Sequence, residues 1–480
     1  MDAGFLKVYP GSVRSRGDSV YMMADTGEGV RLAVYGADRV LFEGEEKSDS
    51  GRAYKLCPLT PANAKVIRKL FDFTNPRSYK GHDVTFGFGD RLGAANPGQI
   101  RAIRDLDVFP VLAQQSIREL NLTDRSFDDV LAAAVWAVFR EGYEKGYGAD
   151  GDHLKTHDEV IYALDRGYSM ITLDCSAYFR NDYASAPQEE IDARYGELPA
   201  DTVSTLEAEY LGRSFVIDQD LTITFSASDL RRAVLVYLPA IDHAVSIYDE
   251  LLKGAGVDYE ISIDETLATT LPQSHFFMAN ELVRRGVEFS GIAPRFVGEF
   301  QKGIDYRGDP AEFERDFIVH AKIAGKFGYR ISVHSGSDKL SIYPFVSKLT
   351  QGRYHVKTAG THWLEALRVI ARYDPGLYRE IHAFAMDNLP EARTYYKITE
   401  DISGIRDLDG VPDAGLPDYL DRDDARQVLH ITFGLILRAK APGGAYLFRD
   451  RIYQFLYIHE AEYIAALDKH IGRHLAALGL

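Results

Sequence analysis

The stretch AEFERDFIVHAKIAGKFGYRISVHS, residues 311–335, contains one complete unit of the pattern that decides the fold. Residues 311–327 form an amphipathic stretch of helical length, and residues 329–333 form a short apolar segment of strand length. This segment ends directly in the polar residues His334 and Ser335. A helix that leads into a strand with a polar end is typical of α/β proteins with a parallel sheet.

The same alternation extends across the middle of the chain. Eight apolar segments of strand length occur there, at residues 84–89, 108–113, 146–149, 170–173, 259–263, 289–293, 329–333 and 354–356, of which 146–149 is the weakest. Amphipathic stretches separate most of them. Eight such units predict an α/β protein with a (β/α)8 TIM-type barrel rather than an open sheet.

The segments outside this region have different patterns. The first part of the chain alternates short apolar runs with Gly-Asp and Gly-Glu turns, which is typical of antiparallel strands, and the last part has helical patterns without strand segments. We therefore expect an N-terminal β-rich element (1–80), a catalytic barrel (81–373) and a helical C-terminal extension (374–480). An acidic, partly helical insert (180–226) after the fourth strand could be a lid or a homo-oligomer contact.

Composition and charge exclude several classes of protein. The 480 residues are 46% hydrophobic and 26% charged, which is typical of globular proteins and excludes fibrous and disordered classes. The net charge of −16 argues against nucleic acid or an anionic membrane as a partner. The chain has two cysteines, no secretory signal and no apolar stretch long enough to span a bilayer, so we expect a cytoplasmic protein.

Three residues at or just beyond predicted strand ends are candidate metal ligands: His153, Glu299 and His334. In barrel enzymes the active site lies at the C-terminal ends of the strands, so these side chains would converge there. Imidazole nitrogen and carboxylate oxygen together bind divalent Zn, Mn, Ni, Co or Fe. A histidine at a strand end can equally be a hydrogen-bonded structural residue, and no spacing motif supports this set.

Carboxylates at the same ends are candidates for acid–base chemistry. Asp152 directly precedes His153, and its alternative role is turn formation. The pair Asp264-Glu265 ends another strand. Because neighbouring side chains of a strand point to opposite faces, only one of this pair should face the barrel axis, and Asp264 could instead be a helix cap or a supporting hydrogen-bond acceptor.

Cationic side chains also lie at the predicted strand ends, namely Arg91, Lys155, Arg295, Lys302, Lys339 and Lys357. Arg and Lys bind carboxylates through charge-assisted hydrogen bonds, so their presence in so acidic a protein suggests an anionic sugar or acid as ligand. Ion pairs with neighbouring acidic residues are the alternative for each of them. Our candidates for binding the ligand are Asp90, Lys155, Arg295 and Lys357.

The glycine-rich segment GFGDRLG, residues 87–93, superficially resembles a dinucleotide-binding loop. Its last glycine is displaced by one position, and Gln114 stands where the acidic residue of that motif is expected. The sequence therefore gives no support for a nicotinamide cofactor.

Taken together, five blocks of the sequence resemble the tagaturonate epimerase family. They are GFGDRLG (87–93), ADGDHLK (149–155), SIDET (262–266), FVGEFQKGIDY (296–306) and SVHSGSDK (332–339). The resemblance implies a divalent-metal-dependent isomerase of hexuronate catabolism that interconverts D-tagaturonate and D-fructuronate. It also implies that His153, Glu299 and His334 bind the metal, with Asp152 as proton acceptor and Glu265 as proton donor, or Asp264 in place of Glu265.

The chemistry of these two sugar acids constrains the mechanism. They differ at a carbinol one carbon beyond the position α to the ketone, so simple enolisation cannot invert it. We therefore expect a metal-assisted retro-aldol and aldol sequence, in which Asp152 takes the proton of the hydroxyl group on the inverting carbon. Transient oxidation by a tightly bound NAD is a rival route.

Other functions share the same pattern of residues. A metal-dependent barrel aldolase or keto–aldo isomerase acting on another sugar or sugar acid would use the same side chains. A glycoside hydrolase also combines a barrel with two carboxylates. A non-catalytic sugar-acid-binding protein is the third alternative.

Overall fold

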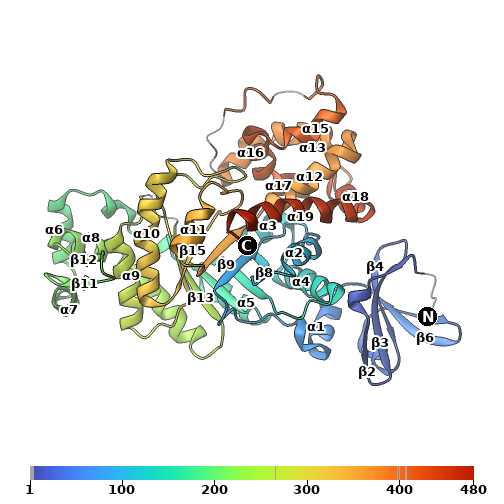
Figure 1. Ribbon diagram of the computed structural model, residues 1–480, viewed down its shortest axis with the longest axis horizontal. Helices are drawn as coiled ribbons and strands as arrows, with labels where there is room; N and C mark the ends of the chain where they lie inside the picture. The colour runs from blue at the N-terminus through green and yellow to red at the C-terminus, as the bar shows by residue number, and fades with distance from the viewer. Residues whose placement is uncertain (1–4, 265, 267, 397, 399–400, 406–407) are drawn as a thin grey trace.

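The computed structural model describes residues 5–264, 266, 268–396, 398, 401–405 and 408–480. Within these residues a closed barrel of eight parallel strands forms the centre of the molecule (Figure 1). Each strand pairs with the next one along the chain, and the last pairs with the first, which confirms the predicted (β/α)8 barrel. The strands are β7 (Val84–Phe88), β8 (Phe109–Ser116), β9 (Gly148–Leu154), β10 (Met170–Asp174), β13 (Asp258–Ile263), β14 (Gly291–Pro294), β15 (Arg330–Val333) and β16 (Tyr354–Thr358).

Strand β9 is longer than the weak segment 146–149 predicted and contains Asp152 and His153. Its pairing with β10 shifts register, because Gly151 pairs with Ile171 whereas Leu154 pairs with Leu173. The extra residue makes a β-bulge, and His153 has a φ of 55° within it. Bulges re-aim side chains next to active sites, and this one turns the end of β9 into part of the barrel mouth.

Side chains alternate along the barrel strands in an unusual way. Apolar residues such as Ile171, Ile261 and Val356 are buried under the surrounding helices, as part of the main hydrophobic core. Barrel interiors are commonly filled by branched apolar residues. Here the alternate positions carry polar side chains that are buried, namely Thr85, Gln114, Asp150, Thr172, Glu260, Ser332, His355 and Lys357. The interior of this barrel is therefore a polar network that continues into the strand ends.

Helices follow the strands and cover the barrel. They are α2 (Asn96–Ile103), α3 (Ile117–Thr123), α4 (Phe127–Glu141), α5 (His157–Leu164), α8 (Ala227–Ile247), α9 (Pro272–Arg284), α10 (Pro310–Phe327), α11 (Tyr343–Leu349) and α12 (Thr361–Tyr373). Helix α10 illustrates why these sequences are helical. The Asp309 side chain accepts a hydrogen bond from the backbone of Ala311, Pro310 occupies the first turn, and Phe313 and Phe317 are buried on one face.

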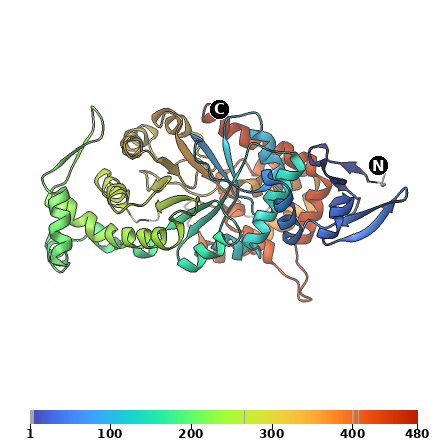
Figure 2. The same cartoon turned by 90° about the horizontal axis from the view of Figure 1, so that it is seen from below.

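Further elements lie before, within and after the barrel. The N-terminal antiparallel sheet consists of β1 (Lys7–Val8), β2 (Arg14–Arg16), β3 (Ser19–Asp25), β4 (Val30–Tyr35), β5 (Glu45–Asp49) and β6 (Arg52–Cys57), and α1 (Pro61–Leu70) follows it. Between β10 and α8 lie α6 (Gln188–Gly196), α7 (Ala200–Tyr210) and the hairpin of β11 (Ser214–Val216) and β12 (Thr222–Thr224). Figures 1 and 2 show this inserted segment and the N-terminal sheet at opposite ends of the molecule.

Helices form the segment after the barrel. They are α13 (Pro375–Asp387), α14 (Leu389–Tyr395), α15 (Leu416–Tyr419), α16 (Asp423–Ile431), α17 (Phe433–Arg438), α18 (Arg449–Ile458) and α19 (Glu460–Ala477). They pack on α2, α3 and α12 of the barrel. The buried Trp363 of α12 donates a hydrogen bond to the carbonyl of Leu429 at 2.9 Å, which fixes α16 against the barrel. Among the described residues, no helix is long and apolar enough to cross a membrane.

Candidate active site

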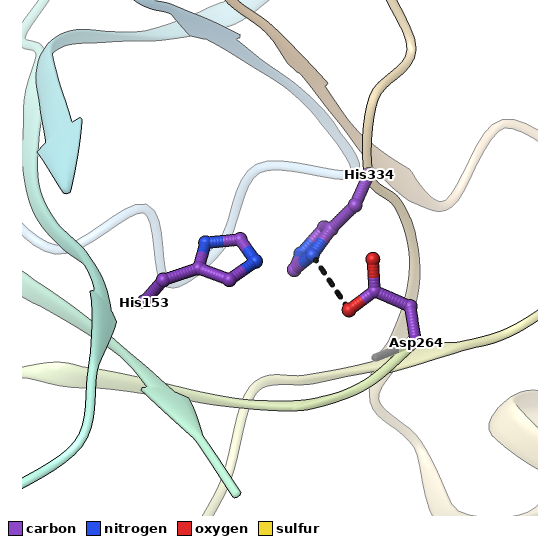
Figure 3. Close-up of side chains that lie close together, drawn as sticks. All are labelled: His153, Asp264 and His334. Atoms are coloured by element: carbon purple, nitrogen blue, oxygen red, sulfur yellow. Dashed lines mark ion pairs between the residues drawn. The ribbon is translucent and has the colours of Figure 1, made fainter. Parts of the chain in front are cut away.

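Two histidines and one aspartate meet at the C-terminal end of the barrel. His153 lies in β9, Asp264 directly follows β13, and His334 directly follows β15. One nitrogen or oxygen atom from each lies within 4.8 Å of the others. Figure 3 shows the two imidazole rings facing each other, with Asp264 beside His334. The ring centroids are 4.9 Å apart, and Nδ1 of His334 lies 3.4 Å from Oδ1 of Asp264.

Each histidine of this group is held by a carboxylate through its second ring nitrogen. Nδ1 of His153 lies 2.8 Å from Oδ1 of Asp152, and Nε2 of His334 lies 2.7 Å from Oε1 of Glu260. Such a hydrogen bond fixes the orientation of a metal-binding imidazole and leaves the other nitrogen for the metal. Nδ1 of His334 is buried, and within the described part of the chain its one close partner is the Asp264 carboxylate at 3.4 Å. The donor set therefore fits a divalent cation.

Negative charge dominates the electrostatics of this group. Burial alone would lower the pKa of His334, but Asp264 and Glu260 raise it to about 10. Burial opposes ionisation of Asp264, yet the neighbouring His334 and His153 lower the pKa of this carboxyl below its ordinary value. Carboxylates beside imidazoles in a buried site create the negative potential that attracts a cation.

A buried lysine connects the two supporting carboxylates. The ammonium group of Lys357 lies 2.8 Å from Oδ1 of Asp152, 3.2 Å from Oε1 of Glu260 and 2.6 Å from Oδ2 of Asp150, and it donates to the hydroxyl of Thr172. Burial opposes its charge, but these carboxylates raise the pKa of Lys357 well above its ordinary value. We call the three candidate metal ligands His153, Asp264 and His334 the metal group. Lys357 borders the cavity at this group, although its ammonium already contacts protein carboxylates.

The other predicted site residues lie at several places. Glu299 follows β14 and borders a second cavity, of about 420 Å³, together with Asp264, Arg295 and His334. The guanidinium of Arg295 donates to the carbonyl of Thr266 at 2.6 Å. The structure thus places Glu299 and Arg295 at a cavity that Asp264 and His334 also border, but Glu299 is not part of the group whose atoms lie within 4.8 Å of one another. Glu265 lies outside the described residues.

Asp90 and Lys155 have local partners. The carboxylate of Asp90 accepts backbone N–H hydrogen bonds from Leu92, Gly93 and Ala95 and so shapes the loop after β7. The half-exposed Lys155 lies 3.2 Å from Asp174. Neither borders the two cavities at the metal group.

Sequence reasoning did not identify every residue of the site. The cavity beside His153 and His334 is also bordered by Gln114 and Lys302, which lie at predicted strand ends, and by Arg118 and His430, which were not predicted. Asp264 was only an alternative to Glu265, although a signal for its position is present. It continues the alternation of Glu260 and Ser262, which face the barrel interior. His430 has no such signal, because it comes from α16, far along the chain.

A second group of potential metal ligands lies under α19 and consists of Asp338, His470 and His474. Its nitrogen atoms already have protein partners. Nε2 of His474 accepts from the backbone N–H of Asp338 at 2.8 Å, and Nδ1 donates to the carbonyl of His470 at 2.8 Å. His470 contacts Thr361 and Arg473 through its two ring nitrogens. This group is therefore a hydrogen-bonded clamp between α19 and the loop after β15.

Comparisons with known proteins agree over almost the whole length. The sequence model of a family described as tagaturonate epimerase matches residues 9–478. A "Tagaturonate/fructuronate epimerase" of Thermotoga maritima is 38% identical over 477 residues, covering 98% of this chain and 97% of that protein. The native crystal structure of a fructuronate-tagaturonate epimerase from Cohnella laeviribosi is 47% identical with a TM-score of 0.96, covering 100% of this chain and 98% of that chain. A glycerol complex of the same protein gives a TM-score of 0.95 at 47% identity, covering 98% of this chain and 96% of that chain.

Proposed function

Because the chain belongs to the tagaturonate epimerase family, we propose that it is an isomerase that interconverts D-tagaturonate and D-fructuronate. The observation that carries this proposal is the pair His153 and His334 at the barrel mouth, each oriented by a carboxylate. Family membership over nearly the whole chain supplies the substrate pair, and this geometry supports the chemistry it requires.

We propose His153, Glu299 and His334 as ligands of one divalent cation, which is Zn, Mn, Ni, Co or Fe. Asp264 lies close enough to both histidines to be a further ligand. When bound, the cation would act as a Lewis acid on the ketone of the substrate. The mixed set of imidazole and carboxylate ligands accepts several metals and so does not select one.

We assign the proton transfers of the reaction to side chains of the protein. Because the inverting carbinol is not activated by the ketone, the proposed route breaks the bond between it and the neighbouring carbon. Asp152 would accept the proton of the carbinol hydroxyl, and the electron pair of the broken bond would move toward the former ketone. The aldehyde then rotates and adds back on its other face, and Glu265 would supply a proton to the re-formed hydroxyl. Transfer of the proton held by Asp152 to Glu265 would restore both carboxyl groups. Although burial opposes the charge of Asp152, Lys357 and His153 lower its pKa well below the ordinary value, so Asp152 is ionised, as a proton acceptor must be, while the same neighbours reduce its proton affinity.

The substrate would lie in the two adjoining cavities at the metal group. Arg295 borders the larger of them and Lys357 the smaller, which supports their proposed contacts with the sugar acid. Lys155 and Asp90 remain proposals at the periphery of this region. A free sugar acid as partner, rather than nucleic acid or a membrane, also fits the net charge of −16, and we place the reaction in the cytoplasm.

The test is to follow tagaturonate–fructuronate interconversion by NMR with chelated and metal-reloaded protein. We expect interconversion to stop on chelation and to return with the correct metal. Full activity after complete metal removal would overturn the metal assignment. A product other than the two hexuronates would favour an aldolase or a keto–aldo isomerase.

A further inference from the structure

The imidazole of His430, in α16, is fully buried, and neither of its ring nitrogens has a hydrogen-bond partner within the described residues. Buried polar groups in folded proteins are almost always paired, because an unpaired group has lost its water without compensation. His382 shares this property, so a histidine of this kind becomes a candidate ligand-binding residue only where it also borders a cavity.

The ring of His430 lies at the cavity of the metal group. The same cavity is bordered by Asp152, His153, Asp264 and His334. Two loops approach the ring closely. A Cβ atom on Gly360 would lie only 2.6 Å from Cε1 of His430, and one on Gly303 would lie 3.4 Å from its Nδ1. Both glycines have positive φ angles, of 83° and 79°, so these loops are shaped to admit the ring beside the cavity.

Positive charge surrounds this end of the cavity. Burial lowers the pKa of His430 well below its ordinary value, and the neighbouring Arg91, Lys302 and Arg426 lower it further, whereas Asp338 acts in the opposite direction. The imidazole is therefore neutral and carries one N–H donor. Arg91 pairs with Glu119 at 3.0 Å, Arg426 pairs with Asp338 at 2.7 Å, and Lys302 also has partners within the protein.

Lys302 lies between the two cavities at the metal group. Its ammonium donates to the hydroxyl of Ser335 at 2.9 Å, and its side chain borders both cavities at the metal group. A neutral N–H donor beside a lysine is a suitable site for a carboxylate, which accepts several hydrogen bonds and carries the complementary charge. Arg118 also borders both cavities, so this end of the site carries more than one cationic side chain.

We propose that His430 is a specificity residue that donates a hydrogen bond to the carboxylate of the sugar acid, with Lys302 supplying the opposite charge. The C-terminal helices thereby complete the binding site of the barrel. This inference rests on the proposed function for the identity of the ligand, and it assigns the carboxylate end of the substrate to the side of the cavity nearest α16.

The experiment compares His430→Phe and His430→Gln with the wild-type holoenzyme. Phenylalanine keeps the size of the ring but cannot hydrogen-bond, whereas glutamine keeps an N–H donor. We expect His430→Phe to raise the KM for tagaturonate by about tenfold or more with kcat within about threefold of wild type, and His430→Gln to lie between them. D-gluconate, a six-carbon sugar acid without a ketone, should bind His430→Phe about tenfold more weakly in calorimetry.

His382→Phe is the matched control, because His382 is a buried histidine in α13 that does not border either cavity. It should leave KM and gluconate binding unchanged. Any of four results would overturn the inference. They are no gluconate binding by the wild type, unaltered gluconate affinity in His430→Phe, a fall in kcat at constant KM, and an equal effect of His382→Phe. If gluconate binding depends on His430 but no interconversion occurs, the proposed function fails and the binding site stands.

Discussion

The ammonium of Lys357 lies 2.8 Å from Oδ1 of Asp152, the same oxygen that lies 2.8 Å from Nδ1 of His153. It also approaches Oε1 of Glu260, the oxygen that pairs with Nε2 of His334. One buried cation thus holds both of the carboxylates that orient the two histidines. This relationship couples the stability of the barrel interior to the geometry of the metal group.

Replacing Lys357 by methionine is expected to damage both stability and metal binding. The change would leave Asp150, Asp152 and Glu260 buried without their cation, which costs about 3–5 kcal/mol of unfolding free energy. The histidines would lose their fixed orientation, so metal affinity should fall by about 10- to 100-fold. Chemical denaturation and metal titration measure the two effects. Lys348→Met, at an exposed position of α11, is the control and should match the wild type.

The two histidine-containing groups should respond differently to alanine substitution. His153→Ala and His334→Ala each remove one imidazole of the candidate metal ligands, so metal affinity and activity should both fall by about a hundredfold or more. His474→Ala breaks the clamp under α19 and should lower stability while the metal content stays at one ion per chain. Elemental analysis of purified variants separates the outcomes. Loss of an ion in His474→Ala would mean that the second group also binds metal.

Asp264 and Glu299 can be compared directly. We expect Asp264→Asn to weaken metal binding by about 100-fold, and at least as strongly as Glu299→Gln, because Asp264 already lies beside both histidines. Both substitutions preserve side-chain size and remove only the charge. Competition with a chromogenic chelator gives the affinities. A larger effect of Glu299→Gln would restrict Asp264 to a supporting role.

Stability should decrease below neutral pH because of buried neutral histidines. Burial lowers the pKa of His382 to about 4, whereas an unfolded histidine titrates near its ordinary value of about 6.5. Between these values the unfolded state binds more protons, so the contribution of His382 is complete above about pH 6.5 and is lost as the pH falls toward 4. At pH 5 the loss is about 2 kcal/mol.

His382→Phe removes this titration and should flatten the pH dependence. Urea midpoints of wild type and variant at pH 7.5 and pH 5 test the prediction. The difference between the two midpoints should be smaller for the variant. An unchanged difference would show that His382 does not contribute to acid sensitivity.

Local sequence was enough to predict the barrel. Each predicted strand segment corresponds to an observed strand. A strand that packs under a helix needs apolar side chains at consecutive or alternate positions, and these are visible in the sequence, as in residues 329–333 and 354–356. Polar residues such as His334 and Lys357 follow in the alternation and mark the interior and the strand ends. The third strand was the weakest prediction, because most side chains of β9 belong to the polar interior rather than to an apolar face.

The partners of each side chain were decided only by the tertiary structure. From the sequence, Lys357 is predicted to be a substrate-binding cation. In the closed barrel its ammonium instead contacts carboxylates from β9 and β13. His430 carries no signal in its own segment and reaches the cavity because α16 packs on Trp363. The sequence by itself determined which helices and strands form, because the spacing of apolar residues along the chain indicates which side chains are buried. Only the closed barrel and the helices over it determined which charges meet, because these contacts join residues that are far apart in the chain.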